Sequence, residues 1–145
     1  MSPRLPQATY NTLIQRSIDL LALYQQAAST CEPGLRVILD ENAQTLDAMI
    51  CDLQTQLRDS GGTPRRNGTL RGAARRYVTG SLVRASTDRS VAWIRELADN
   101  ESGLLQAFEK VVAALPAESA LALRRQIPRL TSIHLDMDNL AGTAL

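Results

Sequence analysis

The chain has 145 residues, of which 44% are hydrophobic and 21% charged, and its formal net charge is +1. This size and composition fit one globular domain, taken as residues 1–145, and exclude a disordered tail, a collagen-like repeat and a disulfide scaffold. No apolar run reaches the roughly 18 residues of a bilayer-spanning helix, so we expect no membrane partner. The first residues lack the apolar stretch of a secretory signal, which predicts a cytoplasmic protein.

Apolar residues recur every three or four positions along nearly the whole chain, a period typical of helices. Glycine and proline divide the chain into blocks, which predict helices over about 9–29, 35–59, 70–84, 88–115 and from 119 onward. The short block at 70–84 has a modest apolar face made of Ala73, Ala74, Tyr77 and Val78. Pro128 predicts a kink in the last helix, because proline cannot donate the helical hydrogen bond.

Short connections near residues 30–34 and 116–119 join the long helices into two hairpins. The alternation of three- and four-residue steps is typical of the seam of a left-handed helical bundle. The sequence therefore predicts an all-α, antiparallel four-helix bundle of two hairpins. A long crossover over about residues 60–87, carrying a short extra helix, connects the two hairpins.

Two positions in the apolar stripes are polar, Glu101 and His134. Counted from the turn near residue 117, they lie at about the same height on adjacent helices, so we expect them to satisfy each other. Together with Glu41 on the second helix, they form a hypothetical site for a single iron or manganese ion. The alternative is a buried Glu–His hydrogen-bond network without any cofactor, and this is the interpretation that we prefer.

Three stretches carry a resemblance to a known family: Leu57–Pro64 (Leu-Arg-Asp-Ser-Gly-Gly-Thr-Pro), Asn100-Glu101, and the segment from Arg124-Arg125-Gln126 to Ile133-His134. They resemble an uncharacterised bacterial ferritin-like family of four-helix bundles, a domain of unknown function, over about residues 10–140. The resemblance implies a ferritin-like fold that keeps three of six ligand positions: Glu41, Glu101 and His134. The other three positions hold Leu21, Gln44 and Thr131, so the resemblance implies a degraded di-iron site.

Arginine is concentrated in the crossover. Residues 58–89 contain eight arginines and two acids, a net charge of +6, whereas the rest of the chain carries −5. Because arginine binds phosphate through paired donors, we consider an anionic partner that binds five of these residues: Arg65, Arg66, Arg71, Arg75 and Arg76. The single aromatic residue here, Tyr77, offers little for base stacking, which argues against nucleic acid. The alternative is that the arginines lie against acidic surfaces of this bundle or of a neighbour.

A second apolar line on the third long helix consists of Trp93, Leu97 and Leu104. Either the crossover helix or a second subunit covers this line. Because tryptophan is a frequent anchor of protein interfaces, the sequence predicts a homodimer.

Motifs of common enzymes are absent: the sequence has no glycine-rich phosphate loop, GxSxG, HExxH or CxxC, and His134 is its only histidine. We therefore expect a non-enzymatic interaction or stress-associated protein on a ferritin-like bundle with a degraded metal site. Two alternatives stay open, a metal-dependent oxidase or iron-handling protein and a binder of anionic partners through the crossover.

Overall fold

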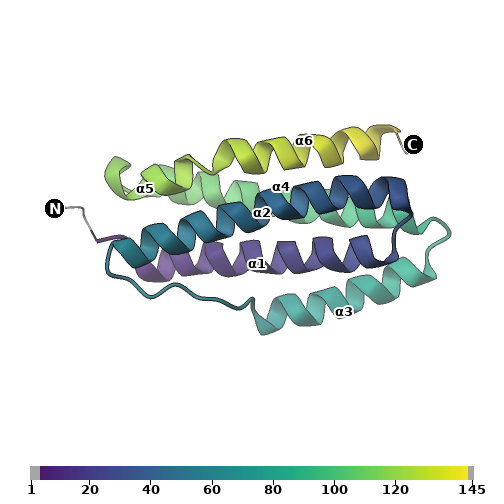
Figure 1. Cartoon of the computed structure of the whole chain (residues 1–145), viewed down its shortest axis with the longest axis horizontal. Helices are drawn as coiled ribbons and strands as arrows, with labels where there is room; N and C mark the ends of the chain where they lie inside the picture. Colours follow the sequence, from purple (N-terminus) through teal and green to yellow (C-terminus); the bar gives the residue numbers. More distant parts are fainter. Residues whose placement is uncertain (1–3, 144–145) are drawn as a thin grey trace.

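The computed structural model describes residues 4–143, in which every regular element is a helix (Figure 1). The helices are α1 (Gln7–Thr30), α2 (Pro33–Asp59), α3 (Leu70–Ala85), α4 (Arg89–Ala114), α5 (Ala117–Arg124) and α6 (Ile127–Thr143). The prediction of an all-α protein is confirmed over these residues. In the same part of the chain, no helix combines the length and the apolar character needed to cross a bilayer.

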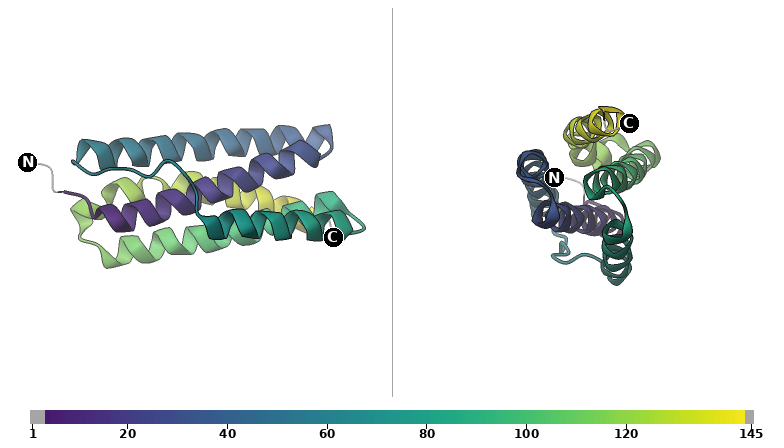
Figure 2. Two further views of the ribbon diagram at one scale, coloured as in Figure 1. Left: turned by 90° about the horizontal axis from the view of Figure 1, so that it is seen from below. Right: turned by 90° about the vertical axis from the view of Figure 1, so that its right-hand side faces the viewer.

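Four helices enclose the apolar core. α1 lies beside α2, α4 lies beside α6, and contacts of α1 with α4 and of α2 with α6 join the two pairs (Figure 1). One contiguous cluster of buried side chains runs between them, with Tyr10, Leu46 and Phe108 among its fully buried members. The end-on view in Figure 2 shows α3 to one side of these four helices, where it contacts α1 and α4.

A glycine pair ends α2 and starts the crossover. Gly61 has φ 95°, a conformation that glycine adopts without the steric cost of a side chain. Its N–H donates to the carbonyl of Arg58 (3.0 Å), and the N–H of Gly62 donates to the carbonyl of Leu57 (2.9 Å). These bonds satisfy the last carbonyls of α2. The stretch at 57–64 therefore contains the C-terminal end of α2 and its cap.

The last predicted helix is interrupted rather than kinked. α5 ends at Arg124 and α6 begins at Ile127, so Pro128 is the second residue of a new helix. Proline is tolerated there because the first N–H groups of a helix have no partner within that helix. The side chain of Gln126 is buried at the junction and accepts a hydrogen bond from Nη1 of Arg129 (3.1 Å). The distortion expected at Pro128 is therefore present as a boundary between two helices.

α3 packs on the bundle with small and polar residues. Thr79, Gly80 and Val83 are its buried residues. A Cβ on Gly80 would lie 2.6 Å from Nε2 of Gln26, so glycine permits the close approach of α3 to α1. The residues of the apolar face identified in the sequence are exposed and do not face the bundle: Ala73, Ala74, Tyr77 and Val78. Close approach and hydrogen bonds, rather than hydrophobicity, determine which face of α3 lies inward.

The apolar line on α4 is covered by the chain itself. Trp93 and Leu104 are 2% exposed and Leu97 is fully buried. The Nε1 of Trp93 donates to Oγ1 of Thr30 at the end of α1 (3.1 Å). The observation that suggested a homodimer is therefore accounted for within one chain, and the homodimer stays a prediction.

Candidate functional site

A row of polar side chains on α1 holds the crossover in register. Its members are spaced four residues apart and so lie on one face of the helix: Gln7, Asn11, Gln15 and Asp19. Gln7 binds the backbone of Thr63, and Asn11 binds the backbone of Thr63 and of Arg65. Gln15 binds the backbone of Asn67, and Asp19 binds the backbone of Thr69; all these distances are 2.8–3.4 Å. The loop after α2 therefore follows α1 and delivers the start of α3 to Asp19.

Asp19 fixes the first turn of α3. Its carboxylate accepts hydrogen bonds from the backbone N–H (3.0 Å) and the hydroxyl (2.8 Å) of Thr69, and it pairs with Arg76 (3.4 Å). Thr69 is the N-cap of α3, and its hydroxyl accepts from the N–H of Gly72 (2.8 Å). A Cβ on Gly68 or Gly72 would lie 2.2–2.3 Å from side-chain atoms of Asp19, so both glycines allow the carboxylate to come this close. A negative charge here is also favoured by the helix dipole.

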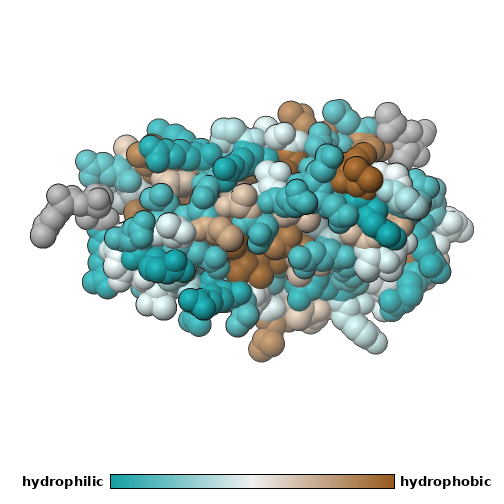
Figure 3. Space-filling view, in the orientation of Figure 1, coloured by the Kyte–Doolittle hydropathy of each residue, from teal (hydrophilic) through white to brown (hydrophobic). Residues whose placement is uncertain are grey.

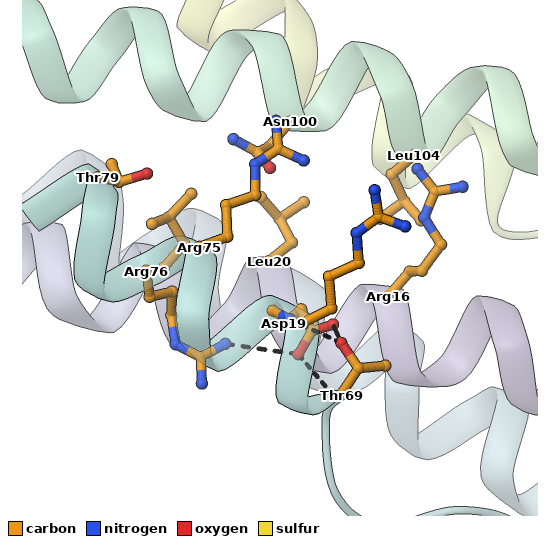
Figure 4. Close-up of a pocket in the computed structure, with 12 residues that line it drawn as sticks. Arg16, Asp19, Leu20, Thr69, Arg75, Arg76, Thr79, Asn100 and Leu104 are labelled. Carbon is orange, nitrogen blue, oxygen red and sulfur yellow. Dashed lines mark hydrogen bonds and ion pairs between the residues drawn. The ribbon is translucent and has the colours of Figure 1, made fainter.

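A pocket of about 470 Å³ lies between α1, α3 and α4 (Figure 4). Asp19 is the acidic residue in its lining, and the alkyl side chains of Leu20, Leu23 and Leu104 form an apolar wall. Four arginines also line the pocket, one from α1 and three from α3: Arg16, Arg71, Arg75 and Arg76. The pocket therefore combines an excess of positive charge with an apolar wall.

Three of these arginines have no carboxylate partner in the part of the chain that the structure describes. Arg76 pairs with Asp19, whereas Arg16, Arg71 and Arg75 have no carboxylate within 4.0 Å among residues 4–143. Figure 4 shows the side chains of Arg16 and Arg75 reaching toward α4, while Arg76 turns to the opposite side and meets Asp19. Asp19, the acidic residue of the lining, is already bound by Thr69 and Arg76. It therefore does not neutralise the other three guanidinium groups, which are left available to an external anion.

The structure separates the five arginines considered as anion ligands. Arg71, Arg75 and Arg76 line the pocket, whereas Arg65 and Arg66 are exposed in the loop outside its lining. Sequence reasoning missed Arg16, because it lies on another helix far from the basic segment. The signal that could have identified Arg16 is its position three residues before Asp19, on the same face of α1.

A second polar cluster lies inside the bundle, between α1, α4 and α6. Glu101 is fully buried, and its carboxyl group is hydrogen-bonded to the hydroxyl of Tyr24 and lies 3.4 Å from Nδ1 of His134. The Nε2 of His134 lies 3.3 Å from Asp138. Burial, with the nearby charges of Asp138 and Asp136, raises the pKa of Glu101 to about 9. The predicted contact between Glu101 and His134 is confirmed, and the glutamate is protonated at neutral pH.

The donors do not fit a di-iron centre. Glu41 is exposed on α2, and residues 4–143 contain no group of three His, Cys, Asp or Glu side chains that could hold a metal ion. Both ring nitrogens of His134 already contact carboxyl groups, and Glu101 would have to lose its proton to bind a cation. The remaining ligand positions supply neither carboxylate nor imidazole: Leu21, Gln44 and Thr131.

Comparison with protein families matches residues 7–114 to the Domain of unknown function (DUF2383), which is more than half of the chain. The chain belongs to the DUF2383 family. Neither the comparison with curated proteins nor that with solved structures gives a match. The resemblance is thus confirmed at the level of a domain of unknown function.

The DUF2383 segment contains the whole pocket. Helices α1 to α4 lie within it, and the lining residues run from Arg16 to Leu104. The segment includes Tyr24 and Glu101 but ends before His134 on α6. All residues of the arginine-lined pocket therefore lie within the region matched to the family, whereas the buried cluster is completed by His134 on α6, beyond that region.

Proposed function

We propose that this DUF2383 protein is a non-enzymatic binding protein for a small organic anion, built on a ferritin-like, antiparallel bundle whose metal site is degraded. The ligand is held in the pocket between α1, α3 and α4 by Arg16, Arg71 and Arg75. The observation that carries the proposal is that these three guanidinium groups line one pocket without a carboxylate partner among the described residues. A cytoplasmic, stress-associated role agrees with this proposal.

The chemistry of the pocket suggests the ligand class. Guanidinium groups present paired N–H donors that match the oxygens of a phosphate or a carboxylate. A pocket of about 470 Å³ is of the size that holds small organic ligands. Its wall of Leu20, Leu23 and Leu104 suits an apolar part of the ligand. We therefore propose an organic phosphate or carboxylate with an apolar body.

Calorimetric titration with phenyl phosphate tests this function. We expect binding that weakens as NaCl is raised, because salt screens the guanidinium charges. Arg16→Gln and Arg75→Gln should each weaken binding about tenfold, the effect of losing a charge-assisted hydrogen bond of about 1.4 kcal/mol.

Arg95→Gln is the matched control, because Arg95 is exposed on α4 and does not line the pocket. This variant removes the same charge and should leave the affinity for phenyl phosphate unchanged. Equal losses in all three variants would indicate a diffuse charge effect and contradict a defined site. Absence of binding to both phenyl phosphate and inorganic phosphate would contradict the proposed function.

The degraded metal site is tested separately by elemental analysis. We expect plasma mass spectrometry to find far less than one iron or manganese per chain after incubation of the untagged protein with ferrous iron. A ratio near one or two that Glu101→Gln abolishes would contradict this part of the proposal.

A further inference from the structure

The outward face of α3 is apolar, although nothing in residues 4–143 covers it. Four large side chains on this face are strongly exposed: Leu70 (91%), Tyr77 (75%), Val78 (55%) and Leu82 (62%). Their spacing places them on one side of the helix. In Figure 3, a hydrophobic side chain projects from the lower edge of the molecule, where Figure 1 places the start of α3. α3 therefore exposes larger apolar side chains than the residues it buries, Thr79, Gly80 and Val83.

This apolar face lies in the most basic part of the chain. Residues 65–85 contain six arginines and no acidic residue. On a helical projection, Arg75 lies along one border of the apolar face and Arg84 along the other, whereas Arg71 falls within the face, between Val78 and Leu82. All three arginines are exposed. The side of α3 that points away from the bundle thus combines large apolar side chains with arginines.

Charge decides between the candidate occupants of this face. Pairing with α3 of a second copy would bring two acid-free basic segments together, and like charges at short distance repel. An anionic bilayer offers negative headgroups to the arginines and acyl chains to the apolar side chains. Tyrosine is also enriched at the membrane interface, and arginine can bury its alkyl chain while its charge stays at the headgroups.

We propose that the outer face of α3 docks onto an anionic lipid surface. Leu70, Tyr77, Val78 and Leu82 enter the interface. Lipid phosphates bind the exposed arginines of this segment that do not line the pocket: Arg65 and Arg66 in the loop before α3, and Arg84 on α3. α3 is 16 residues long and lies along the surface of the bundle, so this is interfacial docking without a spanning segment. The expectation of no membrane partner rested on the absence of an apolar run long enough to span a bilayer.

Co-sedimentation of the full chain with vesicles tests the proposal. We expect at least about tenfold stronger binding to phosphatidylcholine vesicles that contain phosphatidylglycerol than to phosphatidylcholine alone, because each basic residue near an anionic surface adds attraction. The triple variant Leu70→Gln, Tyr77→Gln, Leu82→Gln should lose about tenfold or more of this binding. Glutamine is a good helix former and these positions are exposed, so circular dichroism should show an intact helical fold.

A matched triple variant changes exposed apolar residues on other helices: Val37→Gln, Leu121→Gln and Leu135→Gln. It should leave vesicle binding unchanged. Failure of the wild-type chain to bind the anionic vesicles, or equal losses in both triple variants, would overturn the proposal. A dimer in analytical ultracentrifugation that the α3 triple variant converts to monomer would also overturn it, because a second copy would then cover the face.

Arg16→Gln separates this inference from the proposed function. Arg16 lines the pocket from α1 and does not belong to the outer face of α3. Loss of phenyl phosphate binding with retained vesicle binding in this variant is expected if both proposals hold. Loss of vesicle binding in Arg16→Gln would contradict docking through the outer face.

Discussion

The buried cluster around Glu101 and the arginine-lined pocket are both built on α1 and α4, yet the first holds a neutral glutamate and the second holds charged arginines. Glu101 is fully buried and holds a proton, so its polar partners Tyr24 and His134 meet an uncharged group. Arg16, Arg71 and Arg75 are exposed to water and keep their charges without a partner among the described residues. Burial removes charge because the low-dielectric interior disfavours ions, whereas water at the pocket sustains it. The comparison favours a structural role for the first cluster and agrees with the binding role that we propose for the second.

The largest expected effect is on the buried cluster. Glu101→Ala leaves a cavity and takes away the partner of Tyr24 and of His134 inside the bundle, which should lower the free energy of unfolding by about 3 kcal/mol. Urea denaturation measures this loss. Glu109→Ala, an exposed position on the same helix, is the control and should change stability little. Equal effects of the two variants would mean that the cluster does not stabilise the fold.

The protonation of Glu101 predicts a pH dependence. Below about pH 4.5 this glutamate is protonated in both the folded and the unfolded chain, and between there and about pH 9 only the folded chain keeps the proton. The free energy of unfolding should therefore fall as pH rises through this window, by at most about 1.4 kcal/mol per pH unit from this group. Above about pH 9 the contribution becomes constant.

Glu101→Gln isolates the pH-dependent contribution of Glu101 to the free energy of unfolding, since glutamine stays neutral and retains hydrogen-bonding groups. The difference in unfolding free energy, wild type minus variant, should decline from pH 5 to pH 9 in urea denaturation. A difference that stays constant or rises over this range would show that Glu101 is charged in the folded chain.

A smaller effect is expected where α3 meets α1. The Cβ of Gly72→Ala would lie 2.3 Å from the carboxyl carbon of Asp19, so either this hydrogen-bonded carboxylate or α3 must shift, and the free energy of unfolding should fall by about 2 kcal/mol. Hydrogen exchange of α3 amides should accelerate. In Gly34→Ala the new Cβ meets no atom within 4 Å, and this control should not destabilise the protein. If Gly72→Ala behaves like this control, the close approach to Asp19 is not required.

The smallest expected effect is the loss of one helix cap. Thr69→Ala takes away the hydroxyl that binds both Asp19 and the N–H of Gly72, at an expected loss of about 1 kcal/mol in thermal unfolding experiments. Thr69→Ser keeps the hydroxyl and should lose much less. Similar losses in both variants would indicate that the methyl group, rather than the cap, stabilises α3. A weaker affinity for phenyl phosphate in Thr69→Ala would connect this cap to the pocket.

Local information in the sequence determined the helices and one side-chain contact. Apolar periodicity and the Gly and Pro breaks predicted the helical segments, because these signals act within a few residues along the chain. Asp88, directly before the third long helix, is its N-cap, and its side chain accepts from the N–H of Val91 (3.2 Å). Glu101 and His134 were paired by counting from one turn, since a short connection keeps two adjacent helices in register.

The inner face of α3 and the pocket depended on the tertiary structure. The sequence showed that Tyr77 and Val78 belong to the apolar face of this helix but not which way the face points. The close approach at Gly72 and Gly80 and the bonds to Asp19 turn the opposite face inward. Arg16 joins the arginines of α3 because the crossover follows α1 in space, over a separation of more than fifty residues in sequence. Local propensity therefore determined which segments are helical, whereas steric fit and long-range hydrogen bonds decided how α3 packs and where its charges gather.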